Sequence, residues 1–307
     1  MRKFLLRTTV FLVLATILMA VLDVCLTHKL RHYYKGRFTV WNEIFNSHID
    51  ADLLIMGSSR AWVHYSPEII DSVLHTHSYN LGIDGSTFNR QYTRYLIYRK
   101  HQPRPRIIIQ NFECTTLSFT TGYEQYQYFP YFYDPDIRRW VLPYEEFSLA
   151  DRVFPFYRYS NFGVEKLFQN KLKVDRGYLG MDDPWKVEPL EDNNLPQFTI
   201  DPRTLSLLKQ FLSETAAEGI RVIFVHSPTH ISLTERQNDV DSMWKTFQQI
   251  ADQYNIPILN YQCDSLSYDT NYFYNRMHLN RKGAELFTRK LANDLKKGHY
   301  VDTNTNR

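Results

Sequence analysis

This chain has few cysteines, and its cysteines and histidines form no cluster with metal-ligand spacing. Three cysteines occur among 307 residues, Cys25, Cys114 and Cys263, which excludes a scaffold built on disulfides. One disulfide between Cys114 and Cys263 is conceivable outside the cytoplasm, although such cysteines are more often small buried side chains. The sequence therefore predicts no metal site and no other cofactor.

A strong excess of charge of either sign is also missing. The 36 lysines and arginines and 33 aspartates and glutamates give a net charge of +3, and the two signs alternate along most of the chain. A nucleic-acid partner requires a basic patch, so we expect none. Repeats and low-complexity tracts are absent, and only the tail at residues 301–307 is expected to be disordered. The hydrophobic content of 43%, with 15% aromatic residues, suffices for one large core or a core plus an insertion.

The amino end combines basic residues with an apolar stretch over residues 8–22, a pattern typical of a signal peptide or a membrane anchor. The stretch can be extended to the roughly 20 residues that a spanning helix needs, and no small-x-small cleavage site follows it. A lipoprotein signal is a third alternative because Leu22 stands three residues before Cys25, but Asp23 and Val24 replace the small residues expected between them. We expect a retained anchor over residues 1–27, a linker over 28–50 and a periplasmic remainder on a single-pass inner-membrane protein. Basic residues on the far flank weaken the positive-inside argument for this orientation: Lys29, Arg31, Lys35 and Arg37.

Short aliphatic runs alternate with helical patterns through the rest of the chain. Strands are predicted at residues 52–56, 78–82, 106–110, 221–225 and 256–260. Helices are predicted at residues 67–74, 86–102, 201–219, 234–254 and 280–297. This alternation predicts an α/β domain over residues 51–300, with a flavodoxin-like parallel sheet between two helical layers. An aromatic-rich insertion over residues 112–200 interrupts it, and a connection of this length is usually a lid or subdomain.

Three segments carry residues suited to chemistry at the carboxyl edge of such a sheet. The first predicted strand ends in Gly57-Ser58-Ser59, the second leads into a glycine loop over residues 80–85, and His278 precedes the last helix. A serine hydroxyl becomes a good nucleophile when a base takes its proton, so Ser59 is the candidate nucleophile and His278 the candidate base. Backbone N–H groups of Ser59 and Gly85 are candidate oxyanion donors. A turn serine, a turn glycine and a capping or packing histidine are the alternatives.

In their order and spacing these segments resemble the SGNH, or GDSL-like, hydrolases. The resemblance covers residues 52–297 outside the insertion, and it is closest to the membrane-anchored branch that includes the D-alanine transfer protein of teichoic acid synthesis and the alginate acetylation proteins. It implies an esterase or acyltransferase activity of the serine-hydrolase type.

Two positions depart from the pattern of that family. The family has an asparagine donor after the third strand, for which Asn111 stands a little early; the alternative is a polar residue closing a strand. Asn275 occupies the position of the aspartate that usually orients the histidine, and an amide cannot offset the imidazolium charge as a carboxylate does. Arg60 is additional: it would hold an anionic group of the substrate or cap the first helix at the surface. His64, His226 and His230 could approach the same edge, but their spacing makes no metal site.

Two functions follow from this sequence. The first is an anchored serine esterase or acyltransferase acting on acyl groups of envelope glycans, for which a membrane acyltransferase is a candidate partner. The second is an inactive SGNH-like module that binds glycan or an assembly partner. Rings of the insertion that we expect to be exposed and to stack on sugars include Tyr126, Tyr131 and Trp140, although tyrosine and arginine also suit a protein interface.

Overall fold

The computed structural model describes residues 1–122, 124–168, 172–186, 198–234 and 240–301. These residues divide into two compact units. Unit 1 comprises Met1–Ser47 and Thr121–Lys173, and unit 2 comprises His48–Thr120 and Val174–Arg307. The tail predicted to be disordered, residues 301–307, begins with Val301, which is buried in the core of unit 2, so the prediction is wrong at that residue. Residues 302–307 lie outside the described residues.

Unit 2 is built on a five-stranded parallel sheet. Its strands are β1 (Leu53–Met56), β2 (Ser78–Asn80), β3 (Ile107–Asn111), β4 (Arg221–His226) and β5 (Ile258–Asn260). The order is β2-β1-β3-β4-β5 and every pairing is parallel, which is the order of flavodoxin-like doubly wound sheets. Each strand overlaps a predicted one, so the predicted parallel α/β sheet is confirmed.

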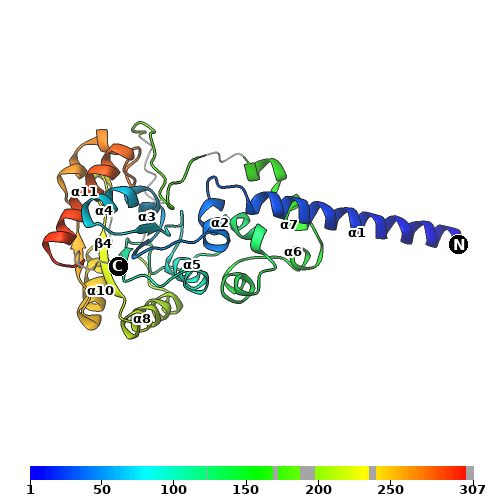
Figure 1. The fold of residues 1–307 in the computed structure, drawn as a ribbon, viewed down its shortest axis with the longest axis horizontal. Coiled ribbons are helices and arrows are strands. Elements are labelled where there is room, and N and C mark those ends of the chain that lie inside the picture. Colours follow the sequence, from blue (N-terminus) through cyan, green and yellow to red (C-terminus); the bar gives the residue numbers. More distant parts are fainter. Residues whose placement is uncertain (123, 169–171, 187–197, 235–239, 302–307) are drawn as a thin grey trace. The chain divides into compact units, whose positions relative to one another are not determined.

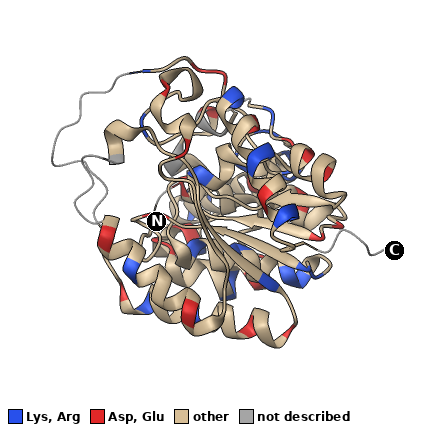
Figure 2. Ribbon diagram, turned by 90° about the vertical axis from the view of Figure 1, so that its left-hand side faces the viewer, with Lys and Arg blue, Asp and Glu red and all other residues tan. Residues whose placement is uncertain are grey.

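Helices cover both faces of this sheet (Figure 1). One face carries α3 (Ser59–His64), α4 (Pro67–Leu74) and α11 (Arg281–Lys297); the other carries α5 (Phe88–His101), α8 (Pro202–Ala217) and α10 (Val240–Tyr254). Shorter helical turns follow the strands: α9 (Ile231–Thr234), η6 (Ser265–Tyr268) and η7 (Thr270–Tyr272). Lysines and arginines are interspersed with acidic residues over the helices (Figure 2).

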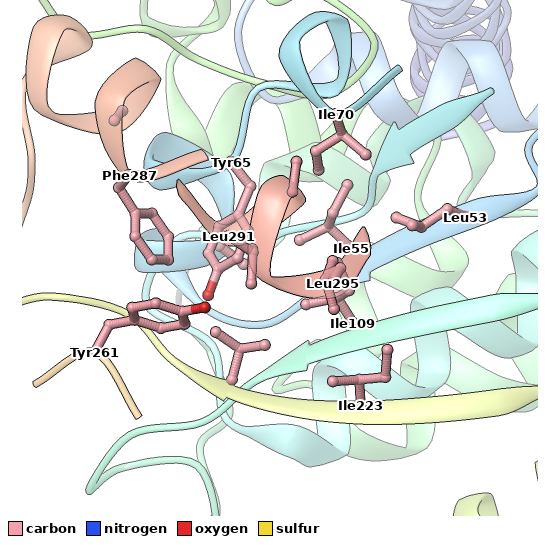
Figure 3. Packing of buried hydrophobic residues seen from close by; sticks show 14 of the residues in the cluster. Leu53, Ile55, Tyr65, Ile70, Ile109, Ile223, Tyr261, Phe287, Leu291 and Leu295 are labelled. Atoms are coloured by element: carbon pink, nitrogen blue, oxygen red, sulfur yellow. The ribbon is translucent and has the colours of Figure 1, made fainter. Parts of the chain in front are cut away.

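Alternate strand residues build a core on each face because side chains along a strand point to opposite sides. Odd-numbered residues of β1, β3 and β4 enter a buried cluster with α4 and α11, part of which is seen in Figure 3: Leu53, Ile55, Ile109, Ile223, Ile70, Leu291 and Leu295. On the other face Phe224 packs edge-on against Phe247 of α10, with ring centroids 5.6 Å apart. Burial on both faces explains why the strands are continuous aliphatic runs.

The ends of the long helices follow from capping. The Asp201 side chain accepts the N–H of Arg203 at the start of α8, and the Asn280 side chain accepts the N–H of Gly283 at the start of α11. Gly219, with φ of 72°, follows the end of α8 and leads into β4. These caps fix where the chain enters and leaves the edge of the sheet.

Unit 1 combines the amino end with the middle of the chain. Its elements are α1 (Arg2–Arg31), α2 (Phe38–Asn46), η1 (Gln125–Tyr131), η2 (Ile137–Val141), η3 (Leu142–Tyr144), α6 (Leu149–Val153), α7 (Tyr157–Phe162) and η4 (Val164–Phe168). Residues 28–47, expected as part of a linker, contain the end of α1 and all of α2, which buries Trp41 and Ile44. The predicted insertion is divided: residues 121–173 belong to unit 1 and the rest to unit 2.

Two features of unit 1 bear on the sequence-based expectations. An 18-residue window of α1 has a mean hydropathy of 2.6 and is 6% buried, so this helix is long and apolar enough to cross a membrane, as many signal sequences are.

The expected exposure of Tyr131 is wrong, because its ring is buried and stacks on Phe45 with centroids 4.1 Å apart. Its hydroxyl donates to Asn42 at 2.8 Å. Buried aromatic rings of this kind form much of the core of unit 1.

Candidate active site

The turn after β1 presents two serines in different roles. β1 is buried throughout and ends at Gly57, whose φ of 151° favours glycine. A Cβ at this position would lie only 2.7 Å from the Cβ of Ala61, so the close approach of α3 also requires glycine. The Ser58 hydroxyl caps α3 by accepting the N–H of Arg60 at 3.3 Å. Ser59 is the first residue of α3, and its hydroxyl serves no cap.

His278 lies directly beside Ser59. Its Nε2 is 2.7 Å from Ser59 Oγ, within the range expected of a nucleophile and its base. The two residues are 219 positions apart in the chain. They meet because β1 and the loop before α11 both reach the carboxyl edge of the parallel sheet, where ligands bind in open α/β folds.

The Asn275 side chain determines which nitrogen of the His278 imidazole carries the proton. Its Oδ1 accepts the N–H of Met277 at 3.0 Å and the N–H of His278 at 2.9 Å, and it lies 3.0 Å from His278 Nδ1. Because two backbone donors already point at this atom, it must be the amide oxygen and cannot be the amino group. His278 Nδ1 therefore carries the proton, and Nε2 presents its lone pair to Ser59.

Burial keeps His278 neutral. It lowers the pKa of His278 to about 4; Asp84 opposes this shift and Arg60 adds to it. The Tyr274 ring stacks on the imidazole at 5.4 Å with an interplanar angle of 6°, which limits its rotation. A neutral, oriented imidazole is available as a base across the neutral pH range.

The predicted glycine loop is tied to α3. Asn80 Nδ2 donates to the carbonyl oxygens of Ala61 at 2.7 Å and Tyr65 at 3.0 Å, and its Oδ1 accepts the N–H of Gly82 at 2.8 Å. All these atoms are buried, so the loop cannot move independently of the nucleophile turn. Gly85, with φ of 59°, lines the same pocket as Ser59. The structure therefore brings the first, second and last sequence segments together.

Asn111 is buried behind the site. Its Oδ1 accepts the Tyr65 hydroxyl at 2.6 Å and the N–H of Ser227 at 3.3 Å. Its Nδ2 is buried and has no hydrogen-bond partner among the residues that the structure describes. Asn111 does not line the pocket, whereas Glu113 and Cys114, which follow β3, do. Its role as an oxyanion donor stays a prediction.

Arg60 is buried, so the alternative of a surface cap is wrong. Its side chain is 4% exposed and lies 3.7 Å from Glu113 through Nη1 and Oε2. Its Nε donates to Ser227 Oγ at 3.2 Å, and its Nη2 donates to the Ser227 carbonyl oxygen. Burial lowers the pKa of Arg60, and Glu113 opposes the shift. An arginine remains charged under these conditions, so a positive charge lies beside Ser59.

His64 supports the segment that carries the base. Its Nε2 accepts the N–H of Leu279 at 3.0 Å, so its Nδ1 carries the proton and donates to Ser227 Oγ at 3.0 Å. Burial holds the pKa of His64 well below its usual range, and the ring is neutral. His226 is also at this edge, where it donates through Nδ1 to the carbonyl oxygen of Phe112 at 2.8 Å.

Sequence reasoning missed Ser227 and Glu113. Ser227 accepts from Arg60 and His64 and thus joins α3 to the end of β4. The sequence contained one signal for Ser227. It is a polar residue directly after β4, and the ends of β4 and β1 lie at the same edge of the sheet, where Ser59 follows β1.

A pocket of about 250 Å³ opens at the serine and histidine. Most of its lining residues carry hydroxyl groups or small side chains: Ser58, Ser59, Arg60, Gly85, Ser86, Thr87, Glu113, Cys114, Thr115, Thr120, Thr229, Leu233, Met277 and His278. Among the described parts of the chain, no group of three or more histidines, cysteines or acidic residues could hold a metal ion.

Comparisons with known proteins give distant structural likenesses. No family model matches the chain, and no curated protein matches it. A candidate platelet activating factor from Streptococcus pneumonia has 12% identity, with 96% of this chain and 99% of that chain covered and a TM-score of 0.45. A family two carbohydrate esterase from Clostridium thermocellum, solved with cellohexaose, has 9% identity, coverage of 83% and 66%, and a TM-score of 0.43. A GDSL-like lipase from Bacteroides thetaiotaomicron has 11% identity, coverage of 79% and 87%, and a TM-score of 0.40. With TM-scores below 0.5, these likenesses assign neither a family nor an activity.

Proposed function

We propose that this protein is a membrane-anchored serine esterase or acyltransferase of the SGNH type, acting on short acyl esters of envelope glycans. The observation that carries the proposal is the 2.7 Å contact between Ser59 Oγ and His278 Nε2, together with the amide oxygen that places the imidazole proton on Nδ1. This is the tautomer that a general base requires.

The proposed reaction begins with transfer of the Ser59 proton to His278 Nε2 as Oγ attacks the ester carbonyl. In this proposal the N–H groups of Ser59 and Gly85, two residues that line the pocket, bind the resulting oxyanion. Collapse of the tetrahedral intermediate expels the alcohol, which takes the proton from His278, and leaves an acyl group on Ser59. Water gives hydrolysis in the second half-reaction, and a hydroxyl group of a second molecule gives acyl transfer.

The pocket supports a short acyl group. Its volume of about 250 Å³ lies below the roughly 300–1,000 Å³ of most ligand pockets. A long aliphatic chain would require a longer apolar trench than this pocket provides. The lining hydroxyl groups of Ser86, Thr87 and Thr115 already donate within the protein, so toward a sugar hydroxyl they can act as acceptors.

The anchor part of the proposal concerns α1. We propose that α1 crosses the inner membrane once and is retained, and that unit 2 is periplasmic. A membrane acyltransferase that supplies acyl groups from the membrane is a candidate partner for such a protein. The test is the accessibility of Cys263, which is exposed, to an impermeant maleimide added to intact spheroplasts, in a Cys25→Ser variant because Cys25 is exposed as well. Labelling only after lysis would contradict the periplasmic location.

Labelling by a fluorophosphonate probe tests the nucleophile. Ser59→Ala should abolish labelling, and the matched control Ser58→Ala should keep it, because the Ser58 hydroxyl is used to cap α3. Equal labelling of both variants would refute the assignment. Absence of labelling and turnover in the folded native protein would favour an inactive module that binds glycan.

Substrate choice is tested by comparing kcat/KM for acetylated oligosaccharides, short-chain aryl esters and long-chain lipid esters. The volume of the pocket predicts turnover of the first two classes and little of the third. A clear preference for the lipid ester would overturn the glycan proposal while leaving the serine mechanism intact.

A further inference from the structure

Helix α1 has two parts with different surroundings. From Phe4 to Leu22 its apolar side chains are largely exposed. From Asp23 onward one side of the helix packs into the core of unit 1, where Leu30 is fully buried against Phe129 and Tyr159, while Val24 and Cys25 on the other side stay exposed. The change toward packing is marked by Asp23, the first buried residue of the helix.

An ion pair marks this change. Both Asp23 oxygens accept from the Arg158 guanidinium, at 2.6 and 3.0 Å, and the Arg158 side chain has no exposed surface. The N–H of Phe156 also donates to Asp23, at 2.8 Å. The turn between α6 and α7 is therefore held at the level of Asp23 along the axis of α1.

The length of the exposed part places this level at a membrane boundary. The stretch from Phe4 to Leu22, at 1.5 Å per residue, is about 28 Å long. The hydrocarbon core of a bilayer is about 30 Å thick. If this stretch spans the core, Asp23 and the turn between α6 and α7 lie where hydrocarbon gives way to headgroups.

Apolar side chains are exposed at this turn. Leu149, Val153, Phe154 and Tyr157 are between 36% and 75% exposed, and Arg152 beside them is exposed as well. Single exposed apolar residues are ordinary, but here four occur within residues 149–157. Aromatic, aliphatic and basic side chains together are typical of surfaces that lie in the membrane interface.

We propose that these four side chains form a lipid-docking surface, which inserts into the interfacial region of the bilayer that α1 crosses. The inference rests on the proposed anchor and goes beyond it. The occupant is lipid because the contacts of Asp23 with Phe156 and Arg158 hold this turn at the end of the exposed apolar stretch of α1. Unit 1 is then held to the membrane at two places, the helix and the surface, which restricts its tilt.

Depth-dependent quenching in lipid nanodiscs tests the proposal on the full chain. Cys25 and Cys263 are replaced by serine, and an environment-sensitive fluorophore is attached to one introduced cysteine at a time. Phe154→Cys reports the docking surface and Leu14→Cys reports the span. Ser47→Cys is the matched control in unit 1, because its neighbour Asn46 bonds to the carbonyl oxygen of Arg31, about 12 Å beyond Asp23 along the helix.

The label at position 154 should emit at shorter wavelength than the label at 47, be quenched by nitroxides near the lipid headgroups and be protected from iodide. Iodide quenching equal to that at position 47 would overturn the docking surface. Protection from both iodide and lipid nitroxides would also overturn it, in favour of a second copy of the chain. The label at position 14 tests the membrane anchor separately from the docking surface. If mid-chain nitroxides do not quench this label, the proposal that α1 spans the membrane is wrong. Val153→Cys repeats the measurement at a second exposed site.

Discussion

Replacing Asn275 by aspartate isolates the electrostatic part of the proposed mechanism. The native amide orients His278 through Nδ1 but carries no charge, and burial lowers the pKa of His278 to about 4. The substitution keeps the accepting oxygen and adds one negative charge beside the ring. Two opposite charges about 4 Å apart attract by about 4 kcal/mol at an effective dielectric constant of about 20.

That attraction would raise the pKa of His278 from about 4 to as high as about 7, since one pKa unit corresponds to about 1.4 kcal/mol. A base works only when unprotonated, so the native protein should keep its kcat/KM down to about pH 4. With the pKa of His278 near 7, the kcat/KM of the Asn275→Asp variant should fall about 100-fold at pH 5. At pH 8 the variant should match or exceed the native protein, because the carboxylate stabilises the imidazolium that forms in the transition state.

The measurement is the pH profile of kcat/KM on a short-chain aryl ester, with circular dichroism at each pH to confirm folding. Asn260→Asp is the matched control, because Asn260 Oδ1 accepts the N–H of Gln262 in the same local arrangement and Asn260 contacts neither Ser59 nor His278. A native acid limb near pH 6.5, or an unchanged limb in Asn275→Asp, would refute the electrostatic reasoning. Loss of activity at every pH in a folded Asn275→Asp protein would show that the amino group of Asn275 has a role of its own.

Three further substitutions test the supports of the site and of unit 1. Gly57→Ala should destabilise unit 2 by at least about 1–3 kcal/mol in urea unfolding, because of its positive φ and because two side-chain carbons lie 2.7 and 2.9 Å from the added Cβ; an unchanged midpoint would contradict the tight turn. Asp23→Ala should lower the free energy of unfolding of unit 1 by about 3–5 kcal/mol, because Arg158 stays buried without its partner. If proteolysis within residues 121–173 is no faster than in the native protein, this prediction is wrong. His64→Phe should lower kcat with little change in KM, because Leu279 N–H loses its acceptor next to the base; a change confined to KM would place His64 at the substrate.

The sheet was predictable because each strand is an aliphatic run bounded by turn residues and buried on both faces. Helices α3 and α9 were not predicted, since six and four residues are too few to show a helical period. Helix α2 did carry a usable pattern: Phe38, Trp41 and Ile44 recur at helical spacing, but the segment was interpreted as a linker. In residues 121–173 the rings follow no period, so their partners could be identified only from the fold.

The part of the site that follows from the order of strands and helices along the chain could be predicted from the sequence. Ser59 and His278 lie at opposite ends of the domain, and the topology of a parallel sheet alone places both at one edge. The contacts of Arg60 with Ser227 and Glu113 join three strand ends through side-chain directions, which no spacing encodes. The departure of Asn275 from aspartate was visible in the sequence, but its acceptance of two backbone N–H groups, which fixes the tautomer, was not.

The pair of Asp23 and Arg158 also sets an order of events during synthesis. The two residues are 135 positions apart, and ribosomes add about 5–20 residues per second, so Asp23 leaves the ribosome about 7–27 s before its partner. During that interval a carboxylate at the end of an apolar helix has no counter-charge, and the core around Leu30 lacks the rings of Phe129 and Tyr159. If α1 is the proposed anchor, the nascent helix enters the membrane as an isolated segment. Unit 1, which extends to Lys173, can close around it only after more than half of the chain has been translated.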